Sequence, residues 1–218
     1  MKLARPLALG AVAALAAAGS AQHEYAYDDG IANITVGPPP SFSVYGDVAV
    51  LWGNYFYAEP GADILTEIHF GLGSLSAGGA VTIHIFDDAD NDGDPRNASP
   101  VYSFATTGEE LGFGFNVVSI DPTQVSGGFF VAIEHTAVYD PAENSFTNPA
   151  RLDPSVPGTY SWLFYDSPGE MPYDNLAGAG FGVQMVSGVF VPIPGAWAIR
   201  AVAVPAPGAA ALLGVAGL

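Results

Sequence analysis

Short apolar runs separated by glycine and proline are the feature of this sequence that most constrains its fold. The chain has 27 glycines and 18 prolines among 218 residues. Many of them break its middle into short runs rich in Val, Ile, Phe, Tyr and Thr. These residue types favour strands, whereas glycine and proline mark turns. Roughly ten such runs, with turns between them, predict an antiparallel all-β fold.

The expected strands are runs of β-type composition in which apolar and other residues tend to alternate. They cover residues 31–37, 47–58, 64–70, 80–87, 100–105, 115–120, 128–136, 159–166, 182–187 and 196–204. In the fourth run, Val81, Ile83 and Ile85 fall on one face. Strands do not alternate with helices, which argues against a doubly wound fold. We expect a single antiparallel β-sandwich, jelly-roll-like, over residues 22–204.

The core of this sandwich has to form without covalent help. The chain has no cysteine, so disulfides cannot stabilise it. Roughly 180 residues between the two terminal segments suffice for one domain and are too few to argue for two. The longest irregular stretch is 137–158. We expect a surface excursion held by prolines there, with a lid or a partner-contact surface as the alternative.

Residues 1–21 have the organisation of a secretory signal peptide. Lys2 and Arg5 form a positive n-region, residues 7–18 are apolar, and Gly19-Ser20-Ala21 supplies small residues at a cleavage point. The apolar run is too short to span a bilayer comfortably. We therefore expect cleavage by signal peptidase and a secreted protein.

Removal of this segment would leave a strongly acidic chain. Arg96, Arg151 and Arg200 would remain against 22 carboxylates, and no lysine follows Lys2. Such a chain repels nucleic acid and anionic membrane surfaces. The missing lysines also exclude a Walker-type phosphate site and Schiff-base chemistry. High acidity favours solubility and cation binding.

The composition changes again after Val204. Residues 205–218 read PAPGAAALLGVAGL, a hinge followed by an apolar run. With the signal peptide, Val204-Pro205-Ala206-Pro207 resembles the PEP-CTERM class of exported bacterial proteins. That class ends in a Val-Pro-Glu-Pro-like motif, an apolar helix and a basic tail. Here Ala206 stands where the class usually has Glu, and the run 208–218 carries no arginine cluster and is too short to span a bilayer.

The PEP-CTERM resemblance implies an exosortase-type sorting enzyme as partner and a transient membrane anchor through 205–218. It also implies a final location at the outer cell surface or in the extracellular matrix, and a tail that continues past Leu218. A flexible apolar tail is the alternative. The body of the chain resembles the β-sandwich domains of such exported proteins, which mostly have no assigned activity. The shared features are an Asp-rich turn between strands and the later run GGFFVAIE, residues 127–134.

The sharpest chemical signal is the acidic run FDDADNDGDP, residues 86–95. Asp88, Asp90 and Asp92 alternate ahead of a glycine, as in the first half of an EF-hand calcium loop. Counted from Asp88, however, position twelve is Ser99 rather than a bidentate Glu, and strands flank the loop. The run is therefore not an EF-hand.

A weak calcium site of another kind remains the expectation for this loop. Its ligands would be Asp88, Asp90, Asp92 and Asp94, while Asp87 adds a ligand or ends the strand. The affinity would lie at about 0.1–1 mM, as in extracellular modules. The alternative is a solvated hairpin turn, because Asp, Asn and Gly are ordinary turn formers.

No established catalytic motif is present. The chain has no G-x-S-x-G and no H-E-x-x-H. His69 and His84 would lie side by side if their runs formed a hairpin centred near Ser76, with Glu67 on the His69 face. They are then either polar strand-face residues or a transition-metal or acid/base site.

Two aromatic clusters leave a binding function open. They comprise Trp52, Tyr55, Phe56 and Tyr57, and then Tyr160, Trp162, Phe164 and Tyr165. Such residues either fill the core or stack on sugars at the surface. The sequence thus favours a non-enzymatic surface or matrix protein. A carbohydrate-binding module with a polysaccharide partner is the alternative, and a glycan-active hydrolase is a third.

Overall fold

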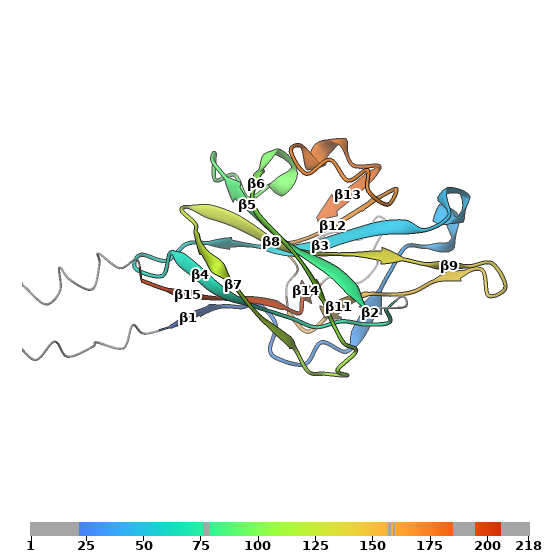
Figure 1. The fold of residues 1–218 in the computed structure, drawn as a ribbon, viewed down its shortest axis with the longest axis horizontal. Helices are drawn as coiled ribbons and strands as arrows, with labels where there is room; N and C mark the ends of the chain where they lie inside the picture. Colours follow the sequence, from blue (N-terminus) through green and yellow to red (C-terminus); the bar gives the residue numbers. More distant parts are fainter. Residues whose placement is uncertain (1–21, 76–78, 157, 159, 185–194, 206–218) are drawn as a thin grey trace, which may run out of the picture.

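A computed structural model describes residues 22–75, 79–156, 158, 160–184 and 195–205. The expected signal peptide and residues 206–218 of the expected sorting segment lie outside the described residues. All the strand pairs are antiparallel, and the strands form two facing layers (Figure 1). The antiparallel β-sandwich predicted from the sequence is confirmed.

One layer is a six-stranded sheet that contains the longest strands. Its order is β13 (Phe181–Gln184), β12 (Ser161–Asp166), β3 (Val48–Tyr57), β8 (Gly128–Ala137), β5 (Ala80–Asp88) and β6 (Ser99–Thr107).

The facing layer consists of a four-stranded and a three-stranded sheet. The first has the order β1 (His23–Tyr25), β15 (Ile199–Val204), β4 (Ile64–Phe70) and β7 (Asn116–Gln124); the second has the order β14 (Ala196–Trp197), β11 (Ala150–Asp153) and β2 (Ile34–Val36). A small hairpin pairs β9 (Tyr139–Asp140) with β10 (Ser145–Phe146).

Helical structure is limited to three short 3₁₀ segments, η1 (Pro40–Tyr45), η2 (Pro95–Asn97) and η3 (Leu176–Gly178), in the part of the chain that the structure describes. Within that same part, the helices fall short of the length and apolarity needed to cross a bilayer.

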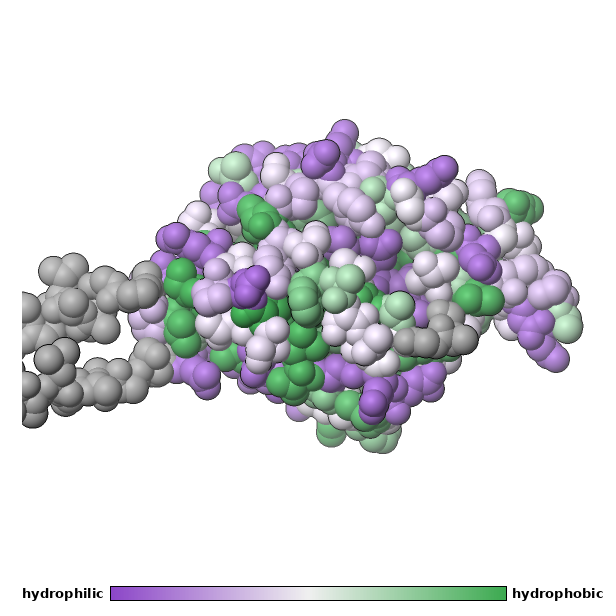
Figure 2. Space-filling view, in the orientation of Figure 1, coloured by the Kyte–Doolittle hydropathy of each residue, from purple (hydrophilic) through white to green (hydrophobic). Residues whose placement is uncertain are grey.

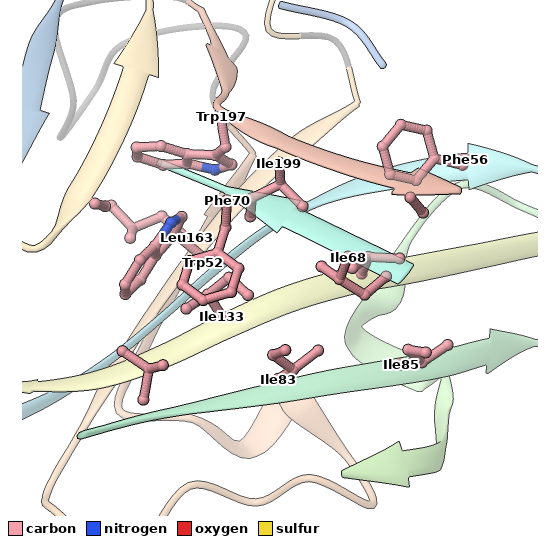
Figure 3. Packing of buried hydrophobic residues seen from close by; sticks show 14 of the residues in the cluster. Trp52, Phe56, Ile68, Phe70, Ile83, Ile85, Ile133, Leu163, Trp197 and Ile199 are labelled. Atoms are coloured by element: carbon pink, nitrogen blue, oxygen red, sulfur yellow. The ribbon is translucent and has the colours of Figure 1, made fainter. Parts of the chain in front are cut away.

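The main core lies between the two layers (Figure 3). Trp52, Ile83 and Ile133 reach it from the six-stranded sheet, and Ile68 and Phe70 reach it from the facing sheet. The predicted alternation in β5 is confirmed, because Val81, Ile83 and Ile85 all point into this core.

A second apolar cluster covers the outer face of the six-stranded sheet. Leu51, Phe130 and Phe164 project from the strands, and Met171 and Leu176 cover them from the segment 167–180. The sheet is therefore buried on both faces, which explains why nine of the ten residues of β3 are buried.

The stretch 137–158 has more regular structure than the irregular excursion predicted for it. It contains the β9–β10 hairpin and β11, the central strand of the three-stranded sheet. Sequence reasoning missed β11 because its four residues include Arg151 and Asp153 and lie between Pro149 and Pro154. The predicted run 196–204 is likewise divided, at Ala198, between two sheets.

Candidate metal centre

The acidic run forms the loop between β5 and β6, at the edge of the six-stranded sheet. Asp88 is the last residue of β5 and pairs with Gly128 at the start of β8. Asn91 (φ 56°) and Gly93 (φ 83°) adopt the left-handed conformation, which turns the chain sharply. Asn and Gly are the residues that tolerate this conformation best.

Hydrogen bonds tie the loop to the strands beneath it. The Tyr55 hydroxyl donates to Oδ2 of Asp88, and the backbone N–H of Gly93 donates to the same oxygen at 3.3 Å. Asn91 Oδ1 accepts from the backbone N–H of Gly128. A Cβ at position 128 would lie 1.6 Å from the Tyr55 hydroxyl oxygen, so the close approach of Tyr55 to the backbone there requires glycine.

Three carboxylates converge in the loop. Asp88, Asp90 and Asp92 each place an oxygen within 4.8 Å of the other two. Ligands at 2.3–2.6 Å from a shared calcium ion would lie at most about 5 Å apart, so the spacing fits one ion. Asp88 is only 1% exposed, and its Oδ1 has no hydrogen-bond donor.

The electrostatics reflect this crowding of carboxylates. Contact with the Asp88 carboxylate, followed by partial desolvation and the charge of Asp92, raises the pKa of Asp90. Burial by itself raises the pKa of Asp88, but the hydrogen bonds from the Tyr55 hydroxyl and the Gly93 backbone N–H, together with the contact with Asp90, outweigh burial and lower that pKa. These opposite shifts make Asp90 easier to protonate than Asp88.

Asp94, the fourth predicted ligand, is directed elsewhere. Its Oδ1 and Oδ2 each accept from Arg96 Nε at 2.8 Å, and its Oδ1 also accepts from the Arg96 backbone N–H at 3.0 Å. Burial raises its pKa, but these bonds outweigh burial and lower it. Asp87 also lies outside the converging group, as a strand residue paired with Ser99. The structure thus brings together three of the four predicted ligands.

Two further contacts orient the exposed carboxylates. Asn97 Nδ2 donates to Asp90 Oδ2 at 2.9 Å, and the Asp94 backbone N–H donates to Asp92 Oδ1 at 2.8 Å. Asn97 belongs to η2, immediately after the loop. Sequence reasoning missed its hydrogen bond to Asp90, because Asn97 lies outside the pattern of alternating aspartates.

His69 and His84 do not lie side by side, because β4 and β5 are not paired with each other. Their strands belong to different sheets, β4 to the four-stranded sheet and β5 to the six-stranded sheet that faces it. His69 Nε2 instead lies 2.5 Å from Glu67 Oε1.

His84 belongs to a polar network on the outer face of the six-stranded sheet. Its Nδ1 lies 2.9 Å from Ser103 Oγ and its Nε2 lies 3.0 Å from Glu134 Oε2. The Tyr173 hydroxyl also donates to Glu134 Oε2, at 2.6 Å, and the Tyr173 ring stacks on the His84 ring. The network fastens the segment 167–180 to the sheet. Sequence reasoning missed it because its members come from four separate segments.

The aromatic clusters divide between core and surface. Trp52 and Trp162 are 0% and 5% exposed, so neither ring is available for stacking. Tyr57 and Tyr160 are 44% and 39% exposed.

Together, the fold and the loop define an antiparallel β-sandwich with a convergent acidic loop at the edge of one sheet. Comparisons with protein-family models, with curated proteins and with solved structures found no match to this chain.

Proposed function

We propose that this chain is an exported, non-enzymatic β-sandwich protein of the cell surface or extracellular matrix, and that calcium binds its β5–β6 loop and stabilises it. The observation that carries the calcium site is the buried Asp88 carboxylate, which has one oxygen without a donor and lies beside Asp90 and Asp92. Export rests on the signal-peptide pattern of residues 1–21 and on the PEP-CTERM-like end, with signal peptidase and an exosortase-type enzyme as partners.

Calcium fits the donor set better than a transition metal does. The three converging groups are carboxylates, and hard oxygen ligands select Ca²⁺ or Mg²⁺ over metals that prefer imidazole or thiolate. Calcium also tolerates irregular geometry and water ligands, which suits a loop with two exposed ligands.

A solvated turn accounts less well for Asp88. A turn carboxylate normally faces water, whereas Asp88 is 1% exposed. A buried carboxylate oxygen without a donor is unfavourable unless a cation or proton compensates it.

The test compares melting temperatures in calcium and in EDTA. With a Kd near 1 mM, about 10 mM calcium raises the melting temperature by roughly 3–6 °C. The double variant Asp90→Asn/Asp92→Asn removes two exposed ligands without disturbing the core, so its melting temperature does not respond to calcium.

Asp121→Asn is the matched control, because Asp121 is an exposed carboxylate on β7. This variant keeps the full calcium response. Identical melting curves of the unmodified chain in calcium and in EDTA would rule the site out.

A further inference from the structure

A groove lined by aromatic rings lies beside the aspartate loop. It encloses about 460 Å³, and its lining includes His23, Glu24, Tyr27, Tyr57, Glu59 and Tyr160. Tyr57 connects the groove to the loop, because its ring packs edge-on against Tyr55, at 5.2 Å between centroids, and Tyr55 donates to Asp88. A Cβ at Gly93 in the loop would lie 3.6 Å from the Tyr57 hydroxyl.

The rings of the groove are held in place before any ligand arrives. Tyr27 is stacked between Phe56, at 5.0 Å, and Tyr160, at 5.2 Å, and its hydroxyl donates to the Tyr55 carbonyl at 2.9 Å. Tyr57 meets Tyr160 nearly at right angles, with centroids 6.5 Å apart. Binding to such rings costs little conformational entropy, because they are already ordered.

The exposed rings suit a ligand with one apolar face and a polar rim. Tyr57 and Tyr160 present amphipathic surface in the groove, and the Glu59 side chain beside them is exposed. Aromatic faces with a few hydrogen-bonding groups are typical of sites for small organic ligands. A pyranose ring fits this description, because its C–H groups face one way and its hydroxyls surround it.

The charge of the molecule restricts which sugars can bind. The chain carries a net charge of −17, and Glu24 and Glu59 line the groove. An anionic polysaccharide would be repelled from such a surface, whereas carboxylates accept hydrogen bonds from neutral sugar hydroxyls.

We propose that this groove binds pyranose units of a neutral polysaccharide, with Tyr57 and Tyr160 as the stacking residues. This role rests on the proposed function, because it needs the chain to act outside the cell, where such polymers occur. Calcium in the adjacent loop supports the Tyr57 side of the groove through Tyr55.

The test is affinity electrophoresis of the full chain through gels that contain laminarin, mannan, galactomannan or xyloglucan, with alginate as the anionic comparison. At least one neutral polymer retards the unmodified chain, and alginate does not. Tyr57→Ala and Tyr160→Ala each weaken that retardation at least tenfold, whereas Tyr160→Phe keeps it. Tyr45→Ala is the matched control, because Tyr45 is a 65% exposed tyrosine on η1, outside the groove.

Melting curves of the variants verify that each one is folded. The proposal is overturned if none of the four neutral polymers retards the chain, if alginate alone does so, or if both alanine variants bind like the unmodified protein. Repeating the gels in EDTA, alongside the melting curves, separates this proposal from the calcium site. If the chain still binds through Tyr57 and Tyr160 while its melting curve does not respond to calcium, the groove is upheld and the metal centre is rejected.

Discussion

Asp153 shows how a single buried carboxylate joins distant parts of this chain. It is 1% exposed and accepts hydrogen bonds from the backbone N–H of Asp29 at 3.0 Å and from the backbone N–H and hydroxyl of Ser155 at 2.8 and 2.6 Å. Burial raises the pKa of Asp153, but these bonds outweigh burial and lower that pKa. The ionised carboxylate therefore fixes the segment after β1 to the end of β11.

A lowered pKa in the folded state means that this stability is present above the unfolded pKa of Asp, about 3.9, and is lost as the pH falls through the folded value. We expect Asp153→Asn to reduce the free energy of unfolding at pH 7 by about 1–2 kcal/mol. The difference between variant and unmodified chain should shrink below about pH 4. Urea unfolding at pH 7 and near pH 3 checks this. An equal difference at both pH values would contradict the ionised role of Asp153.

The segment 167–180 acts as a cover for one face of a sheet. It has little regular structure beyond η3, yet it places Met171 and Leu176 on the outer apolar cluster and Tyr173 on Glu134. A β-sandwich normally exposes one face of each sheet. This cover is what allows β3 and β8 to be apolar on both faces.

Shortening an apolar side chain of this segment tests how much the cover contributes to the stability of the fold. We expect Leu176→Ala to lower the free energy of unfolding by about 2–4 kcal/mol, because Leu176 is 1% exposed and the change leaves a cavity. Leu111→Ala, at a 44% exposed leucine, should change it by less than about 0.5 kcal/mol. Urea unfolding measures both. Equal values would mean that the segment does not share the cooperative unfolding of the sandwich.

At the scale of the whole molecule, the charge balance opposes folding. The net charge is −17, and polar residues cover much of the face in Figure 2, with apolar residues scattered among them. Uniform charge of one sign keeps a protein soluble but destabilises its compact state by self-repulsion. The core has to overcome this repulsion without disulfides, since the chain has no cysteine.

Screening by salt should therefore stabilise the molecule. Raising NaCl from about 0.1 to 1 M shortens the Debye length from roughly 10 to 3 Å. We expect this addition of NaCl to raise the melting temperature, measured with EDTA present throughout, by at least about 2 °C, because less repulsion remains in the folded state. Thermal unfolding followed by circular dichroism gives the value. A constant or falling melting temperature would show that self-repulsion is not a significant term.

The sequence by itself determined the features that depend on neighbouring residues. Strand composition and turn residues predicted the all-β sandwich and located nearly all of the long strands, and the period of two placed Val81, Ile83 and Ile85 on the core face. The spacing of Asp88, Asp90 and Asp92 was enough to predict that they meet, because a tight loop brings alternate residues together whatever surrounds it.

The tertiary structure alone decided the features that depend on which strands become neighbours. It separated His69 from His84, brought His84 to Glu134, and buried Trp52 and Trp162 while leaving Tyr57 and Tyr160 exposed. Strand composition and alternation specify a face to be buried but not the partner that buries it. That partner is chosen by contacts between residues far apart in the chain, such as Asp29 with Asp153, which no local pattern encodes.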